Sequence, residues 1–316
     1  MRGRQAMSSG AAAPLPSGGM NEASATTPCS PGPVVLALFE SGRPSSCLHW
    51  AARLARDTGA HLHVVRVLPA EKEVGCVLGA HNALQILRAV EHTLVSHRST
   101  CSWLRRLSCP DSMPRRFSIV RGDFVTQIGR YVDEVQAQLL LLPAQKDGLS
   151  EIVGALSART RTPVLVSRTP CTVQTIVAAT DLRHGEYPVL RFAGALGRRM
   201  NSDIIAVHNL DPQPMWGRAK TQDAVDVLRG EAGRAAGLAR LRRASEFLLA
   251  PVQAVVRDDA DPVDAILDEA RARDAHLVVI GQRPGRRCDR FGVAARVVDF
   301  AQRSVLVIPI PYEVEP

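Results

Sequence analysis

The sequence predicts an α/β protein made of two similar domains in tandem, each with a five-stranded parallel sheet. Three observations predict this fold class. Short apolar runs alternate with segments of helical periodicity, the same order of runs and helices occurs twice, and the runs are apolar throughout instead of alternating with polar residues. Parallel strands joined by helices are buried on both faces, and this burial requires continuous apolar runs.

The expected strands and helix starts follow from these patterns. In the first copy the strands lie near residues 33–39, 61–68, 116–121, 138–143 and 163–167. In the second copy they lie near residues 174–180, 203–209, 251–257, 275–281 and 304–309. Asp261 can cap a helix whose first turn contains Pro262, and Asp123 can cap the corresponding helix of the first copy.

Three blocks match in the same order in the two copies, with small drifts in spacing between them, which indicates an internal duplication. Trp50 corresponds to Phe192, and Phe39 corresponds to Asp181, each pair being 142 residues apart. The last strands of the two copies correspond at a separation of 141 residues. Because Phe192 repeats the aromatic residue, we interpret Trp50 as core packing on a helix face and not as part of a cofactor site.

Length and composition predict the domain boundaries. With 316 residues, 46% hydrophobic and 22% charged, the chain is long enough for two globular domains. We expect a disordered tail at residues 1–32, which are rich in Ala, Ser, Gly and Pro, a first domain at residues 33–170 and a second at residues 171–316. The tail is either flexible or lies upstream of a start near Met20.

Several function classes are disfavoured. No apolar run approaches the roughly 20 residues of a membrane helix and no export signal is evident, so we expect a cytoplasmic protein without a membrane partner. Seven scattered cysteines without a Cys-x-x-Cys pair argue against a disulfide framework and a zinc site. His61 and His63 share a strand face, but no further ligand completes a metal site. The formal charge is +8, but only 4% of the residues are aromatic and the arginines are spread along helices, so a solvated surface is favoured over nucleic-acid binding.

In their order and spacing these features resemble the universal stress protein family. The resemblance covers roughly residues 33–311 and rests on short motifs that occur in both copies, such as the aromatic-Ala-x-x-Leu-Ala segment at Trp50–Ala55 and the strand Pro163–Val166. It implies a Rossmann-like, adenine nucleotide alpha hydrolase-like fold in each copy. In such a fold an adenine nucleotide lies past the carboxyl ends of the first and fourth strands.

In that family the loop after the fourth strand has the form Gly-x-x-Gly-(nine residues)-Gly-Ser/Thr, and its amides face phosphate, while an Asp that ends the first strand reaches the ribose or a metal ion. The first copy departs from this pattern. Phe39 stands at the Asp position, Pro143 at the first loop glycine, and Ser150–Glu151 at the Gly-Ser/Thr pair. Pro143 removes an amide donor and Glu151 repels phosphate, so we expect no ATP binding by the first copy.

The second copy retains more of the family's nucleotide site. Asp181 and Gly281 stand where the family has them, and Gly285 and Gly292 supply glycines to the same loop at other spacings. Phe291 and Gly292 stand at the Gly-Ser/Thr pair, so the hydroxyl is missing.

Arginines in this loop provide a different anion-binding chemistry. Arg283 and Arg286 are two of them, and a guanidinium group is a good phosphate ligand. The loop is therefore either an alternative anion site or a solvated segment that meets an acidic partner.

These observations leave two main hypotheses. The first is a non-catalytic stress-response or regulatory module without a cofactor, whose halves pack as a pseudo-dimer through strands 163–167 and 304–309 and which acts on an unidentified protein partner. The alternative is an adenine-nucleotide sensor in which the second domain binds ATP or AMP. Catalysis is not expected, because the sequence has no nucleophile elbow, no P-loop and no pyrophosphatase loop. A hydrolase of the wider nucleotide-binding superfamily is a third hypothesis.

Overall fold

The computed structural model describes most of the two predicted repeats. The described residues are 32–39, 45–68, 115–144, 148–168, 172–183, 187–210, 223–246, 248, 251–259, 261–283 and 292–310. They belong to one compact unit, residues 31–316. Apart from Gly32, the predicted tail lies outside the described residues, as do residues 169–171 at the predicted domain boundary, so these boundaries stay predictions.

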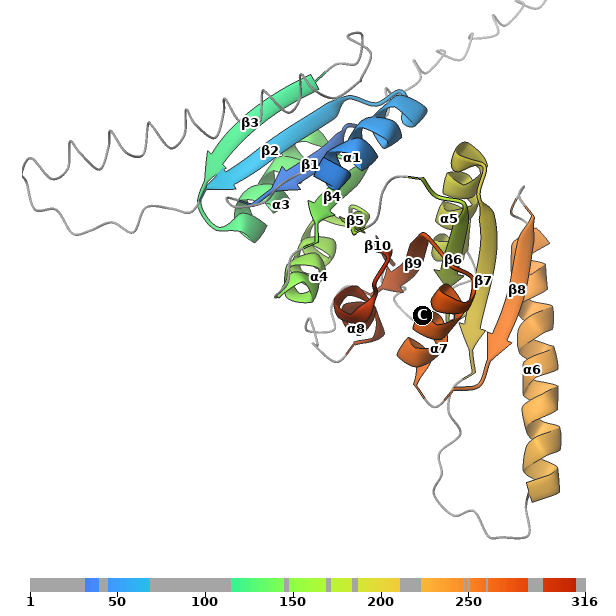
Figure 1. Ribbon diagram of the computed structural model, residues 1–316. Coiled ribbons are helices and arrows are strands. Elements are labelled where there is room, and N and C mark those ends of the chain that lie inside the picture. The colour runs from blue at the N-terminus through green and yellow to red at the C-terminus, as the bar shows by residue number, and fades with distance from the viewer. Residues whose placement is uncertain are drawn as a thin grey trace, which may run out of the picture. The chain divides into compact units, whose positions relative to one another are not determined.

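The described parts of both repeats follow the same order of strands and helices, except that the second repeat has a helix between its second and third strands (Figure 1). The corresponding residues of the first repeat, 69–114, lie outside the described residues. The first repeat consists of β1 (Val34–Leu38), α1 (Ser45–Thr58), β2 (Leu62–Leu68), β3 (Arg115–Arg121), α3 (Phe124–Val135), β4 (Leu139–Pro143), α4 (Leu149–Thr160) and β5 (Val164–Ser167). The second consists of β6 (Thr175–Ala179), α5 (Pro188–Met200), β7 (Asp203–Asn209), α6 (Asp223–Glu246), β8 (Val252–Arg257), α7 (Pro262–Ala272), β9 (Leu277–Gln282), α8 (Val293–Phe300) and β10 (Ser304–Pro309).

The strands of each repeat are parallel, as predicted, but the two repeats share one sheet. The strand order is β3-β2-β1-β4-β5-β10-β9-β6-β7-β8. The two five-stranded halves meet where β5 and β10 pair antiparallel, with Leu165 beside Leu306. The expectation of two separate sheets is therefore corrected to one ten-stranded sheet. The physical reason is that β5 and β10 would each leave an unpaired row of N–H and C=O groups at an edge, and their pairing satisfies both rows.

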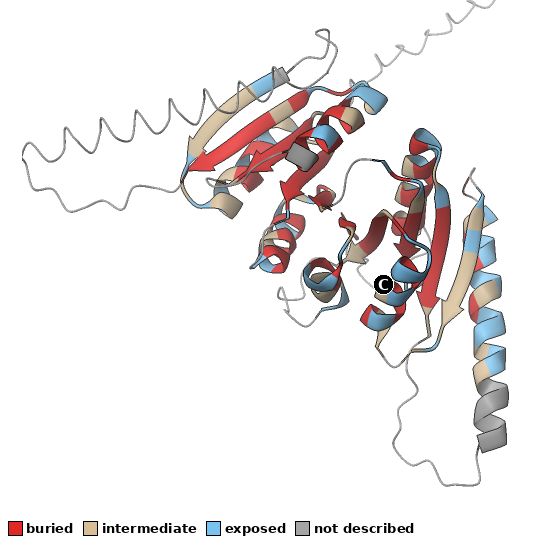
Figure 2. Cartoon of the chain, in the orientation of Figure 1, coloured by how far each residue is buried: buried red, intermediate tan, exposed pale blue. Residues whose placement is uncertain are grey.

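Helices cover both faces of the sheet, and each face has its own apolar core. On one face α1, α5 and α6 pack over the strands, with Trp50 fully buried and Leu190 and Leu241 beside the second repeat's strands. On the other face α3, α4, α7 and α8 contribute side chains such as Ile128 and Val297. Figure 2 shows the resulting pattern, in which the strands are mostly buried and the outer surfaces of the helices are exposed.

Two predicted helix caps are present. The carboxylate of Asp261 accepts a hydrogen bond from the backbone N–H of Val263 at 2.8 Å, and Asp123 accepts one from Thr126 at 2.8 Å. Both carboxylates satisfy a backbone donor in the first turn that has no partner within the helix. These caps fix where α7 and α3 begin, next to the carboxyl ends of the strands.

Helix α8 also contacts the first repeat through side chains. Ser150 of α4 donates a hydrogen bond to the Asp299 carboxylate at 2.7 Å. Arg168, which follows β5, donates to the Val298 carbonyl oxygen at 2.5 Å, and its backbone N–H donates to the Ser304 hydroxyl at 3.1 Å. The junction between the repeats therefore combines a strand pair with polar contacts to one helix.

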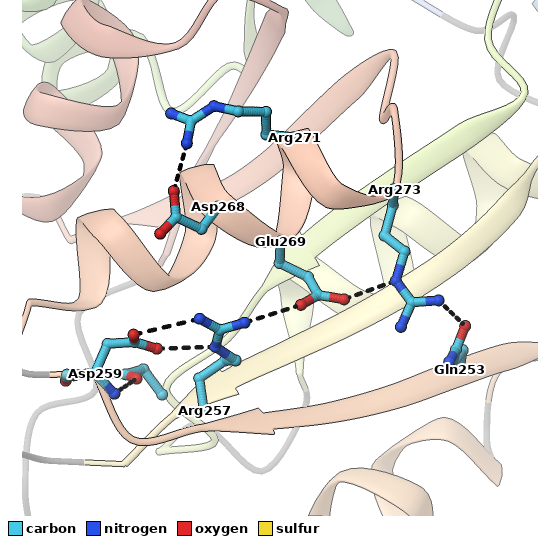
Figure 3. Close-up of polar contacts among 8 residues, drawn as sticks. Gln253, Arg257, Asp259, Asp268, Glu269, Arg271 and Arg273 are labelled. Atoms are coloured by element: carbon cyan, nitrogen blue, oxygen red, sulfur yellow. Dashed lines mark hydrogen bonds and ion pairs between the residues drawn. The ribbon is translucent and has the colours of Figure 1, made fainter.

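A polar network fastens α7 to the edge strand β8 (Figure 3). Glu269, whose side chain is only 6% exposed, accepts hydrogen bonds from Arg273 at 2.8 Å and from Arg257 at 3.4 Å. Arg257 also donates to both carboxylate oxygens of Asp259, and Arg273 donates to the side chain of Gln253. One buried carboxylate thus joins the helix to two positions on the strand.

We expect Glu269→Ala to lower the free energy of unfolding by about 1–3 kcal/mol, because it leaves two partly buried guanidinium groups without their shared acceptor. Asp268→Ala is the matched control. Asp268 is the neighbouring residue and pairs with Arg271 at 2.6 Å, but both side chains are half exposed or more, so its loss should cost less than about 1 kcal/mol. Urea unfolding of both variants tests this, and equal midpoints would contradict it.

The same network makes the free energy of unfolding depend on pH. The Arg257 guanidinium, which donates to Asp259, holds the pKa of Asp259 below its ordinary value. A carboxyl group whose pKa is lowered in the folded state stabilises the fold above its unfolded pKa, about 3.9, and loses that contribution as the pH falls through the folded pKa. We expect Asp259→Asn to reduce the loss of stability between pH 6 and pH 3, measured by urea midpoints. An unchanged pH dependence would count against the contact.

Candidate functional site

A crevice opens at the carboxyl ends of β6, β7 and β9, on the second repeat. Its volume is about 290 Å³. In the second repeat the chain runs from β6 to β7 and β8 on one side, and β9 and β10 lie on the other side of β6. The boundary between β6 and β9 is therefore a topological switch point, where ligands of open α/β sheets bind. The lining residues are Ala179, Thr180, Asp181, Arg183, Tyr187, Pro188, Val189, Val207, Asn209, Pro262, Ile266, Ile280, Gly281, Arg283, Val293 and Ile310.

Three helices begin at this crevice. The first residues of α5, α7 and α8 are Pro188, Pro262 and Val293, and all three line it. Helix N-termini carry partial positive charge from backbone N–H groups that have no partner within the helix. The crevice is therefore an electrostatically favourable place for an anion.

Helices α8 and α4 occupy corresponding positions in the two repeats. The partial positive charge at the N-terminus of α8 is less compensated by nearby side chains than that of α4. The cap residue of α8, Gly292, has no side chain to accept a hydrogen bond, and the first turn contains no acidic residue. In the first repeat, α4 carries Glu151 in its first turn, which places a negative charge at the same helix end. An anion is thus favoured beside α8 and disfavoured beside α4.

Asp181 and Arg283 meet across the crevice mouth. The Asp181 carboxylate accepts a hydrogen bond from Arg283 Nη2 at 2.7 Å and another from the backbone N–H of Arg183 at 3.1 Å. The side chains of Asp181 and Arg283 are 45% and 37% exposed, so solvent and a ligand can reach both. The crevice thus presents one carboxylate and one guanidinium group, and each can bind a ligand in place of the other.

The turn that carries Asp181 has an unusual backbone conformation. Leu182 adopts φ 57, in the left-handed region, and its side chain is buried in the core. A residue other than glycine pays about 1–2 kcal/mol for this conformation, so the surrounding contacts must hold it. The Thr180 hydroxyl accepts from the Leu182 N–H at 3.1 Å, and Nδ1 of His208 lies 3.0 Å from the Thr180 carbonyl oxygen.

Gly281 has a packing reason to be glycine. A Cβ atom at this position would lie 2.3 Å from Ile310 Cδ1 and 3.1 Å from Val189 Cγ2, so these side chains occupy the space that a larger residue would need. Gly281 and Ile310 both line the crevice. Gly281 is therefore needed because the Ile310 side chain packs directly against its backbone.

Asn209, at the end of β7, has its amide committed to a strand junction. Its Nδ2 donates to the carbonyl oxygens of Asp259 and Leu210, and its Oδ1 accepts from the Asp259 N–H. Asn209 therefore lines the crevice, but its Nδ2 group already donates to these two carbonyl oxygens.

The predicted site residues are only partly brought together. Asp181, Gly281 and Arg283 line one crevice, and Gly292 caps the helix that begins there. Gly285 and Arg286 lie outside the described residues, and their assignment stays a prediction.

Sequence reasoning missed most of the other lining residues, among them Arg183, Tyr187 and Ile310. Local signals existed for two of these three, since Arg183 follows Asp181 by two residues and Tyr187 directly precedes the helix-starting Pro188. Ile310 carried no such signal, because its place depends on how β10 lies beside β9.

The corresponding position in the first repeat is filled by aromatic rings. Phe39, which stands where the second repeat has Asp181, stacks on Phe124 with ring centroids 3.9 Å apart and planes inclined by 14°. Phe124 in turn is the first residue of α3, as Pro262 is of α7. Two stacked rings replace a carboxylate and a proline, so the first repeat presents an apolar surface where the second presents charge.

The remaining candidates have structural explanations. His63 lies 3.2 Å from the Tyr131 hydroxyl, and across the described residues no group of three or more His, Cys, Asp or Glu side chains is arranged to hold a metal ion. Cys47 is buried, and this burial raises the pKa of its thiol to about 12. Among the described helices, not one combines the length and apolar character needed to cross a bilayer.

Comparison with known proteins agrees with this architecture. Residues 172–309 match the model of the universal stress protein family. A universal stress protein from Archaeoglobus fulgidus has 12% identity and a TM-score of 0.57, covering 87% of this chain and 96% of that chain. A functionally unknown protein from Pseudomonas aeruginosa has 18% identity and a TM-score of 0.58, covering 88% and 92%.

A shorter solved structure matches one repeat. The universal stress protein from Archaeoglobus fulgidus in complex with dAMP is 27% identical over 43% of this chain and 98% of that chain, with a TM-score of 0.30. No curated protein matches the chain.

The two full-length likenesses establish the fold of both repeats, and the family model assigns the second repeat. Residues 172–309 therefore match the universal stress protein family, and the first repeat has the same fold.

Proposed function

We propose that the protein is a non-catalytic regulatory module of the stress response whose second repeat binds a compact adenine nucleotide. The observation that carries this proposal is the contrast between the repeats: a charged crevice in the second and a stacked aromatic pair at the same place in the first. The first repeat then serves as a packing partner and not as a second nucleotide site.

The size and lining of the crevice support a compact ligand. Its volume of about 290 Å³ lies at the lower end of ligand pockets, which run from about 300 to 1,000 Å³. Apolar walls from Val189, Ile266 and Val293 suit a base, and a few polar groups suit orientation. A nucleoside monophosphate fits these dimensions better than a triphosphate.

The charges of the crevice support the orientation of such a ligand. Asp181 can accept hydrogen bonds from ribose hydroxyl groups, and Arg283 can donate to a phosphate. The uncapped N-terminus of α8 adds backbone N–H donors next to Arg283. Binding would replace the Asp181–Arg283 contact with one contact to each end of the ligand.

The lining residues also support a role without catalysis. Among those that the structure describes, Asp181 is the one carboxylate, and both its oxygens already accept hydrogen bonds. The described lining contains neither a histidine nor a cysteine that could act as base or nucleophile. We propose that the output is altered affinity for a protein partner in the cytoplasm.

We expect AMP to bind more tightly than ATP in isothermal titration calorimetry and to raise the melting temperature, because a ligand that binds only the folded state stabilises it. Asp181→Ala and Arg283→Ala should each weaken AMP binding about tenfold, the loss of one charge-assisted hydrogen bond. Asp203→Ala is the matched control, since Asp203 is an exposed carboxylate at the opposite end of the strands.

Two results would oppose this function. If AMP, ADP and ATP all fail to bind at millimolar concentration, the nucleotide part of the proposal is wrong. The protein would then be a module that acts through protein contacts alone. Phosphate release from ATP above a purified blank, lost in Asp181→Ala, would show that the protein is a hydrolase.

A further inference from the structure

Helix α6 reaches the turn that carries Asp181. Nη2 of Arg240 donates a hydrogen bond to the carbonyl oxygen of Leu182 at 2.8 Å, although the two residues are 58 positions apart in the sequence. Leu182 is the residue with the left-handed backbone, so this contact acts on the least favourable peptide of the turn.

The other hydrogen bonds of the turn come from nearer by. Thr180 and Asp181 each accept a hydrogen bond from the backbone N–H two residues further on, and His208 of the neighbouring strand β7 contacts the Thr180 carbonyl oxygen. These contacts hold the residues on either side of Leu182. Of the bonds that the described residues make to this turn, the Arg240 bond is the one that holds the Leu182 carbonyl.

The turn places the Leu182 side chain in the core and the Asp181 side chain at the crevice. Leu182 is 2% exposed and packs in the core beneath α5 and α6, while the neighbouring Asp181 stays 45% exposed at the crevice. The side chains of these two successive residues therefore lie in different surroundings, one in the core and one at the crevice. If the Leu182 peptide relaxed, the Asp181 carboxylate would move with it.

Helix α6 packs on the strands one turn before Arg240. A Cβ atom on Gly237 would lie 3.4 Å from His208 and from Val256, so this point of the helix lies directly against β7 and β8. Gly237 and Arg240 are three residues apart and share a helix face. The docking of α6 and the conformation of the turn are therefore linked through Arg240.

We propose that Arg240 is a positioning residue for the ligand site, which holds the Leu182 peptide so that Asp181 faces the crevice. The inference rests on the proposed nucleotide binding and deepens it: affinity in the second repeat depends on α6, which does not itself line the crevice. Arg240 acts through Asp181 and touches no ligand.

The first experiment needs no ligand. Amide hydrogen exchange followed by mass spectrometry on the peptide that spans residues 180–183 should show faster exchange in Arg240→Ala than in the wild type. Arg242→Ala is the matched control, because Arg242 lies on the same helix, is exposed and makes no hydrogen bond or ion pair that is recorded among the described residues. Unchanged exchange in Arg240→Ala, or equal changes in both variants, overturns the positioning role.

The second experiment is a double-mutant cycle with AMP as the probe. Arg240→Ala should weaken AMP binding about fivefold in the wild-type background, Arg240→Lys should restore part of the affinity, and Arg242→Ala should not change it. In the Asp181→Ala background, Arg240→Ala should cause no further loss, because the residue acts through Asp181. An equal loss in both backgrounds indicates general destabilisation and overturns the inference.

The two experiments separate this inference from the proposed function. If the wild type binds no AMP but exchange rises only in Arg240→Ala, the turn is held as proposed and the ligand is wrong. If AMP binds normally to both the wild type and Arg240→Ala, the proposed function stands and the positioning role of Arg240 is refuted.

Discussion

The structure depends on one constraint: a parallel sheet must be covered on both faces. Every strand near the centre of this sheet is buried, and its side chains alternate between two apolar cores. Within the sheet, polar groups are therefore accommodated mainly where strands end. In the second repeat the ends of β6, β7 and β9 also coincide with the starts of three helices, whose N-termini carry partial positive charge.

The two repeats meet this constraint in different ways at the same place. In the second, Asp181 and Arg283 remain exposed and pair with each other. In the first, Phe39 stacks on Phe124, and the following helix supplies its own negative charge through Glu151. Both copies of the fold are needed to complete the ten-stranded sheet. The strand ends of the first copy can pack aromatic rings without disturbing that sheet, because the stacked rings lie beyond β1.

The junction between the repeats follows from the same reasoning about unpaired groups. β5 and β10 satisfy each other's edge hydrogen bonds. Helix α8 spans from the crevice, at Val293, to the junction, where Asp299 accepts a hydrogen bond from Ser150. The helix whose N-terminus faces the candidate ligand therefore also contacts the first repeat. The first repeat is consequently in physical contact with the helix that lines the crevice of the second.

The sequence by itself determined the fold class, the duplication and the order of the elements, because continuous apolar runs and helix caps such as Asp261 are local signals. It also predicted that Asp181 and Gly281 belong together, because their positions follow a family pattern, and both residues line the same crevice. Three features emerged only from the three-dimensional structure: the sheet is continuous, Phe124 stacks on Phe39, and Ile310 lines the crevice of the second repeat. Arg240 reaches the turn from 58 residues away. Such contacts depend on which distant segments pack together, and periodicity along the chain carries no information about that.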